Sequence, residues 1–149
     1  MQIEIDQSGK IENTSQLTII ADSVGNCVTL KSKDKKYLQQ LFRDAEKPKM
    51  FVIETFALSV LFLIKKSFSR SNIYFIDVEY PGKNEIIKSY IIRFAKKIKI
   101  SIVPEQIQFK LVGKSSKAHE TAYGVFSKKV KGENVDIKVI LRILLDFFE

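Results

Sequence analysis

Apolar residues alternate with polar ones near the start of the chain, a pattern typical of half-buried strands. Ile3, Ile5 and Ile11 follow this period, with a turn or bulge at Ser8-Gly9. Residues 16–22 and 27–30 predict two further strands, separated by a hairpin turn at Val24-Gly25-Asn26. The opening of the chain therefore predicts a three-stranded antiparallel meander.

The apolar period becomes helical from Asp34, and Pro48 ends that helix. Residues 50–68 are apolar nearly all round, which predicts a helix covered on several sides, although residues 51–53 would also suit a short strand. Residues 72–78 form a β-branched and aromatic run, typical of a strand buried on both faces.

The second half of the chain alternates between helical and strand patterns. A basic amphipathic helix is predicted around residues 86–94, and a last strand within 101–112. Two further helices are predicted, one through about residue 128 and one from about 135 to 148. The order predicts one α/β domain over 1–149, with a mixed five-stranded sheet: three antiparallel strands, then strand-helix-strand units, with helices on both faces.

The composition supports a folded chain and excludes several protein classes. The 149 residues are 45% hydrophobic, with only 6 Gly and 3 Pro, which excludes collagen-like and disordered chains. The single cysteine, Cys27, cannot form an intrachain disulfide, so we expect a reducing, cytoplasmic location. The start does not resemble a secretory signal, and the apolar stretch 50–64 is shorter than the roughly 20 residues of a spanning helix. No membrane association is therefore expected.

The charge balance indicates an anionic partner. Lys and Arg number 25 against 17 Asp and Glu, a net charge of +8, which favours nucleic acid, either DNA or RNA. Part of the excess follows the last predicted strand, where hydroxyls and lysines at a helix start would suit a phosphate. An ordinary capped helix with a solvated lysine face remains the alternative. The candidate nucleic-acid-binding residues are Lys83, Lys114, Ser115 and Lys117.

Four acidic residues stand in apolar surroundings, where an ionised carboxylate is costly unless it is paired or metal-bound. They are Asp6, Glu54, Asp77 and Asp136. Two like charges about 5 Å apart repel by roughly 3 kcal/mol at an effective dielectric near 20, so convergence of the four would require protons or cations. Hard oxygen ligands select Mg²⁺ or Mn²⁺, and two such ions promote phosphodiester cleavage.

Three of the four acids also have a purely structural interpretation. Asp136 suits a helix N-terminus, Glu54 could pair with a lysine, and Asp6 could be a turn residue. Glu79 and Asp22 are further acids at neighbouring strand ends. His119, the only histidine, could move a proton or lie on a helix surface, and Cys27 has no evident base beside it.

The order of elements and the placement of the acids resemble the ribonuclease H-like superfamily of nucleases, which includes Holliday-junction resolvases and transposases. The resemblance implies metal ligands at Asp6 on the first strand, Glu54 on the first long helix, Asp77 on the fourth strand and Asp136 on the C-terminal helix. The segments 111–119 and 134–136 resemble the resolvase ending. Two features depart from that pattern, because the segment 48–72 is unusually apolar and only one acid begins the last helix.

The sequence therefore predicts a divalent-metal-dependent endonuclease, with these four acids as catalytic residues and metal ligands. A non-catalytic nucleic-acid-binding or assembly module on the same fold is the main alternative. A third possibility is an interaction domain, in which the apolar helix at 50–64 forms a homodimer surface.

Overall fold

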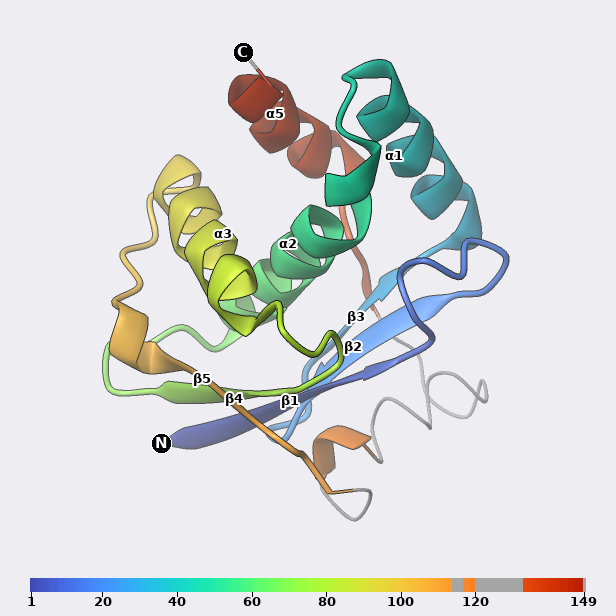
Figure 1. Ribbon diagram of the computed structural model, residues 1–149. Helices are drawn as coiled ribbons and strands as arrows, with labels where there is room; N and C mark the ends of the chain where they lie inside the picture. The colour runs from blue at the N-terminus through green and yellow to red at the C-terminus, as the bar shows by residue number, and fades with distance from the viewer. Residues whose placement is uncertain (114–116, 120–132, 149) are drawn as a thin grey trace.

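A mixed sheet covered on one face by helices forms the frame of the protein in the computed structural model, which describes residues 1–113, 117–119 and 133–148 (Figure 1). The strand order is β5-β4-β1-β2-β3-β6. The strands are β1 (Gln2–Ser8), β2 (Thr18–Asp22), β3 (Cys27–Leu30), β4 (Ile73–Asp77), β5 (Ile107–Lys110) and β6 (Glu133–Asn134). Strand β2 is antiparallel to β1 and β3, whereas β4 is parallel to both β1 and β5. The mixed α/β class is thus confirmed.

The predicted number of five strands is wrong, because the short strand β6 extends the sheet beyond β3. Glu133 and Asn134 pair in parallel with Val28 and Thr29. The Thr29 hydroxyl donates to Asn134 Oδ1 at 2.6 Å, and the Val135 N–H donates to the Thr29 carbonyl at 2.8 Å. A two-residue polar strand has no alternating pattern of its own, so only contact with β3 defines it.

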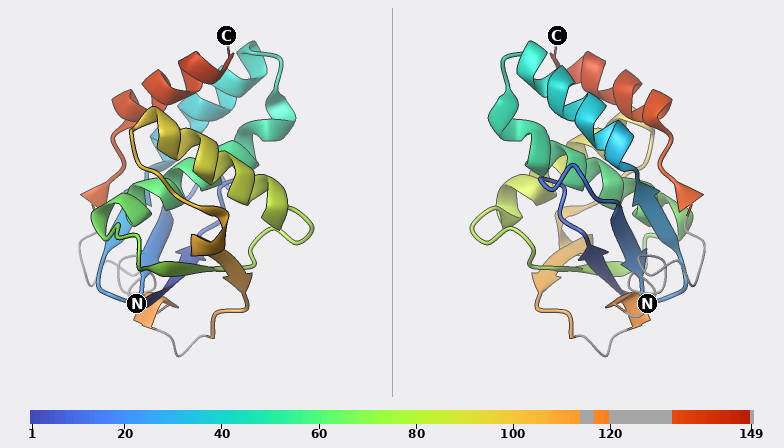
Figure 2. Two further views of the ribbon diagram at one scale, coloured as in Figure 1. Left: turned by 90° about the vertical axis from the view of Figure 1, so that its left-hand side faces the viewer. Right: turned by 90° about the vertical axis from the view of Figure 1, so that its right-hand side faces the viewer.

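The four long helices of the described residues all lie on one side of the sheet (Figures 1 and 2). They are α1 (Ser32–Asp44), α2 (Phe51–Lys66), α3 (Asn84–Lys97) and α5 (Ile137–Phe148). On the other side, the described helical residues are 117–119. Helices were predicted on both faces, and on this second face the described residues include one helical turn. The rest of the helix expected up to about residue 128 lies outside the described residues.

Helix α2 is apolar nearly all round because other elements of the chain surround it. It packs against α1, α3 and the sheet, and most of its side chains are buried. Burial inside the chain thus explains the composition of the 50–64 segment, which no longer argues for a dimer. Among the described helices, none combines the length and the apolar character needed to cross a bilayer.

Alternation along the central strands separates a core face from a polar face. Ile3, Ile5 and Ile76 belong to the core beneath the helices. The intervening residues of β1 and β4 therefore point to the opposite face of the sheet. This second face carries Asp6 and Asp77.

Strand β5 lies within the segment 101–112, where the last strand was predicted. A 3₁₀ turn, Pro104–Gln106, precedes it, and the strand ends at Lys110. Proline lacks an N–H for the ladder, which agrees with a strand that begins only after Pro104.

Candidate metal centre

Three carboxylates converge where the parallel pairing of β1 and β4 ends. Asp6, Asp77 and Glu79 each place an oxygen within 4.8 Å of the others. Ile5 pairs with Ile76 across the parallel strands, so the next residues, Asp6 and Asp77, stand side by side. Glu79 follows Asp77 by two residues. This group of three acids can hold a metal ion.

Burial and the neighbouring carboxylates both penalise the charged forms of Asp6 and Glu79. Burial raises the pKa of Asp6; the hydrogen bond with His119 opposes this, and the charge of Asp77 adds to it. Burial, hydrogen bonding to Asp77 and the nearby negative charges raise the pKa of Glu79 to about 8. A cation would relieve the same repulsion that a proton relieves here.

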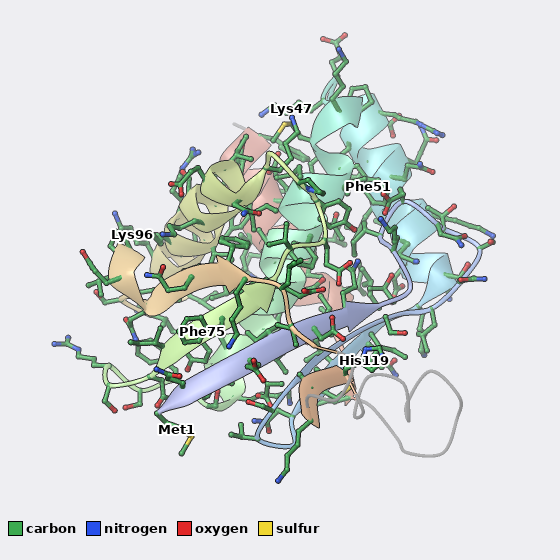
Figure 3. All side chains as sticks on the ribbon, turned by 60° about the horizontal axis from the view of Figure 1, so that its bottom comes forward. Met1, Lys47, Phe51, Phe75, Lys96 and His119 are labelled. Atoms are coloured by element: carbon green, nitrogen blue, oxygen red, sulfur yellow. The ribbon has the colours of Figure 1, made fainter. Side chains whose placement is uncertain are left out.

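Residues from later in the chain contact Asp6 and Asp77. The Val112 N–H, just beyond β5, donates to Asp77 Oδ1 at 2.8 Å. His119 Nδ1 lies 2.9 Å from Asp6 Oδ2, although 113 positions separate the two residues in the chain. Figure 3 shows His119 on its helical turn beside the sheet. The histidine is therefore part of the acidic site, and the interpretation as a mere surface residue does not describe its position.

Glu54 lies outside this cluster. It is only 3% exposed in the middle of the helix layer, where Lys47 and Arg93 are the positive charges that act on it. Burial raises its pKa to about 7. The expected convergence of Glu54 with Asp6 and Asp77 does not occur, because its carboxylate belongs to the helix layer and theirs to the opposite face of the sheet.

Asp136 is also separate from the cluster. Its Oδ1 accepts from the Lys138 N–H at 3.0 Å, and its carbonyl accepts from two further amides in the first turn of α5. This is the helix N-terminal role that the sequence left open. Asp136 follows β6, and β6 lies three strands from β1, a distance on the order of 14 Å at the usual strand spacing.

The remaining acid at a strand end, Asp22, caps a turn. It accepts from the Val24 and Asn26 amides at 3.0 and 2.8 Å, and from Asn26 Nδ2 at 3.0 Å. Gly25 adopts φ +95° between them, a conformation that favours glycine. The carboxylate of Asp22 therefore stabilises the hairpin that joins β2 to β3.

Two of the four candidate phosphate-binding residues are described. Lys83 is exposed at the start of α3, in the loop that follows Glu79, and Lys117 is exposed in the same turn as His119. Lys114 and Ser115 lie outside the described residues. Both described lysines belong to segments that carry residues of the acidic site.

Glu79 and His119 were only secondary candidates from the sequence, yet both belong to the site. The two-residue spacing between Asp77 and Glu79 was a usable signal, because extended residues two apart point to the same face. No local signal relates His119 to Asp6. Comparison of the chain with protein-family models, curated proteins and solved structures finds no match, so the site's geometry is the basis for any function assigned to it.

Proposed function

We propose that this protein is a divalent-metal-dependent phosphodiester hydrolase that acts on nucleic acid, with Asp6, Asp77 and Glu79 as ligands of Mg²⁺ or Mn²⁺. The observation that carries the proposal is the convergence of these three carboxylates where the parallel pairing of β1 and β4 ends. An all-oxygen donor set favours hard divalent cations.

The arrangement of the sheet supports the same proposal. Strands β1, β2 and β3 form an antiparallel meander, and β4 and β5 continue the sheet in parallel on the other side of β1. This resembles the ribonuclease H-like architecture that the sequence suggested, with one acid on the first strand and one on the fourth. We therefore include a ribonuclease H-like fold in the proposal.

The chain's own residues have separate tasks in this mechanism. A divalent cation held by the acids supplies positive charge, which stabilises the charge that develops on the phosphate and makes a nearby water more acidic. His119, fixed by its contact with Asp6, takes or gives a proton at the edge of the site. Lys83 and Lys117 attract the nucleic acid backbone, consistent with the net charge of +8.

The test is cleavage of end-labelled single strands, RNA–DNA hybrid and branched DNA with Mn²⁺, Mg²⁺ or EDTA. The parent protein is compared with Asp77→Asn, which keeps the size of the side chain but removes its charge. Asp136→Asn is the matched control, because asparagine also caps helices and Asp136 lies outside the cluster. We expect metal-dependent cleavage by the parent and the control, and a loss of at least about 100-fold in Asp77→Asn.

Equal cleavage by the parent and Asp77→Asn would remove the mechanism. Salt-sensitive binding of nucleic acid without cleavage in any metal would instead support the non-catalytic binding module on the same fold.

A further inference from the structure

An aromatic ring lies beside the acidic site on the same face of the sheet. Phe75 precedes Asp77 by two residues in β4, so the two side chains point the same way, about 6.6 Å apart along the strand. The ring is only partly buried, unlike its neighbours Tyr74 and Ile76 in the core. Figure 3 shows Phe75 and His119 on this side of the molecule.

A lysine lies against this ring and is held by a carboxylate. Lys110 pairs with Asp77 across β4 and β5, but its Nζ turns back to lie 4.6 Å from the centroid of the Phe75 ring. The same Nζ lies 2.8 Å from Glu4 Oε2. Glu4 is the partner of Phe75 on β1, so these three side chains form one small patch next to the acids.

The interactions that hold Lys110 in this patch are weak. The side chains of Lys110 and Glu4 are 43% and 30% exposed, and water screens an ion pair at that exposure. A cation over an exposed ring is also held only loosely. Lys110 can therefore leave Glu4 for a phosphate, and its departure uncovers the ring.

We propose that Phe75 and Lys110 form a binding site for one unpaired nucleotide next to the phosphate at the acidic cluster, with the base stacked on Phe75 and the adjoining phosphate bound by Lys110. The inference rests on the proposed function and narrows its substrate to single-stranded nucleic acid. Bases in a duplex are already stacked on each other and leave no face for the ring. Aromatic stacking combined with lysine contacts is how proteins bind single strands without reading sequence.

The first test uses the intact protein and needs no substitution of its catalytic groups. Affinity is measured by fluorescence anisotropy, with Ca²⁺ present and absent, for a short oligothymidylate and for a strand of the same length without bases. Both strands carry the same phosphates. The parent should bind the base-containing strand roughly 5- to 150-fold more tightly, the range expected for one stacked base.

The variant Phe75→Leu should lose most of that preference, and Phe75→Tyr should keep it because the ring remains. Tyr37→Leu is the matched control, since Tyr37 is an exposed aromatic residue on α1, in the helix layer. Circular dichroism verifies that each variant is folded. Equal preference in the parent and Phe75→Leu would overturn the inference.

The second test substitutes Lys110 and its partner Glu4 in separate variants, and the two substitutions should change the affinity in opposite directions. Lys110→Gln should weaken binding and flatten the dependence of log affinity on log salt by about 0.7, the value for one phosphate contact with a single strand. Glu4→Gln should strengthen binding, because it removes the group that competes for Lys110. Unchanged affinity in both variants would exclude Lys110 from the site.

The results also separate this inference from the proposed function. Preference for base-containing strands without cleavage in Mn²⁺ would retain the nucleotide site and remove the hydrolase. Cleavage of single strands with the same KM in the parent and Phe75→Leu would retain the hydrolase and remove the nucleotide site.

Discussion

Asp6 and Asp77 stand side by side where the parallel pairing of β1 and β4 ends, because Ile5 of β1 pairs with Ile76 of β4. Parallel pairing brings the carboxyl ends of both strands to the same side of the sheet. Because Asp6 and Asp77 occupy equivalent positions in the register, both side chains point to one face. Two residues that are 71 positions apart in the sequence thereby form the centre of an acidic site. Their mutual repulsion makes the site responsive to cations.

Divalent metal should stabilise the folded protein through this site. At a concentration 100-fold above the Kd, a bound ion adds about 2.7 kcal/mol to the free energy of unfolding, a rise in Tm of roughly 5–10 °C. Differential scanning calorimetry with Mn²⁺ should show this rise in the parent protein and in Asp136→Asn. In Asp77→Asn the rise should be largely absent, and an equal rise in all three proteins would place the metal elsewhere.

Removal of the histidine should separate proton transfer from metal binding. His119→Gln deletes the group that contacts Asp6 at 2.9 Å but leaves the three acids. Loss of a general acid or base typically lowers kcat by about 100-fold or more. We expect such a loss in a cleavage assay, together with a metal-dependent rise in Tm close to that of the parent. A variant with parental kcat would show that His119 only positions Asp6.

Glu54 should make the stability of the protein depend on pH. Burial raises its pKa from 4.5 to about 7, so the folded state favours the protonated side chain. The associated stability is present below the unfolded pKa and is lost as the pH rises towards 7. Glu54→Gln should therefore be more stable than the parent by on the order of 3 kcal/mol at pH 8 and nearly equal to it at pH 4.

Urea denaturation of both proteins at several pH values measures this difference. Because the acids of the metal centre are present in both proteins, the comparison isolates Glu54. A difference that does not change with pH would show that the folded and unfolded states protonate Glu54 alike.

Lys35 should contribute to stability through buried hydrogen bonds. Its side chain is fully buried in α1, and Nζ donates to the Asn13 carbonyl at 2.6 Å, to Thr18 Oγ1 at 2.9 Å and to the Lys10 carbonyl at 3.2 Å. Lys35→Met would leave these acceptors without their donor, at a cost of about 2–3 kcal/mol. Thermal denaturation should show a fall in Tm of roughly 5–10 °C. The exposed Lys36 provides the control, since Lys36→Met should change Tm little.

Local patterns were sufficient for most of the elements. The alternation around Ile3 and Ile5, the helical spacing after Asp34 and the apolar run at 72–78 each predicted an element that the structure contains. These signals are local because side chains two apart in a strand, or three and four apart in a helix, share one face. Strand β6 was missed because Glu133 and Asn134 form a strand only by pairing with β3.

The candidate site shows where local reasoning ends. Asp6 and Asp77 were identifiable because an acid at the end of an apolar strand is costly unless it has a role. Whether Glu54, Glu79, Asp136 or His119 joins them depends on which face and which layer each side chain occupies. The sequence is compatible with several groupings of these side chains. The register of the strands and the positions of the helices determine which grouping forms. Long-range packing places Glu54 in the helix layer, Asp136 at the start of α5 and His119 against Asp6, since interactions between distant segments leave no periodic signal in the sequence.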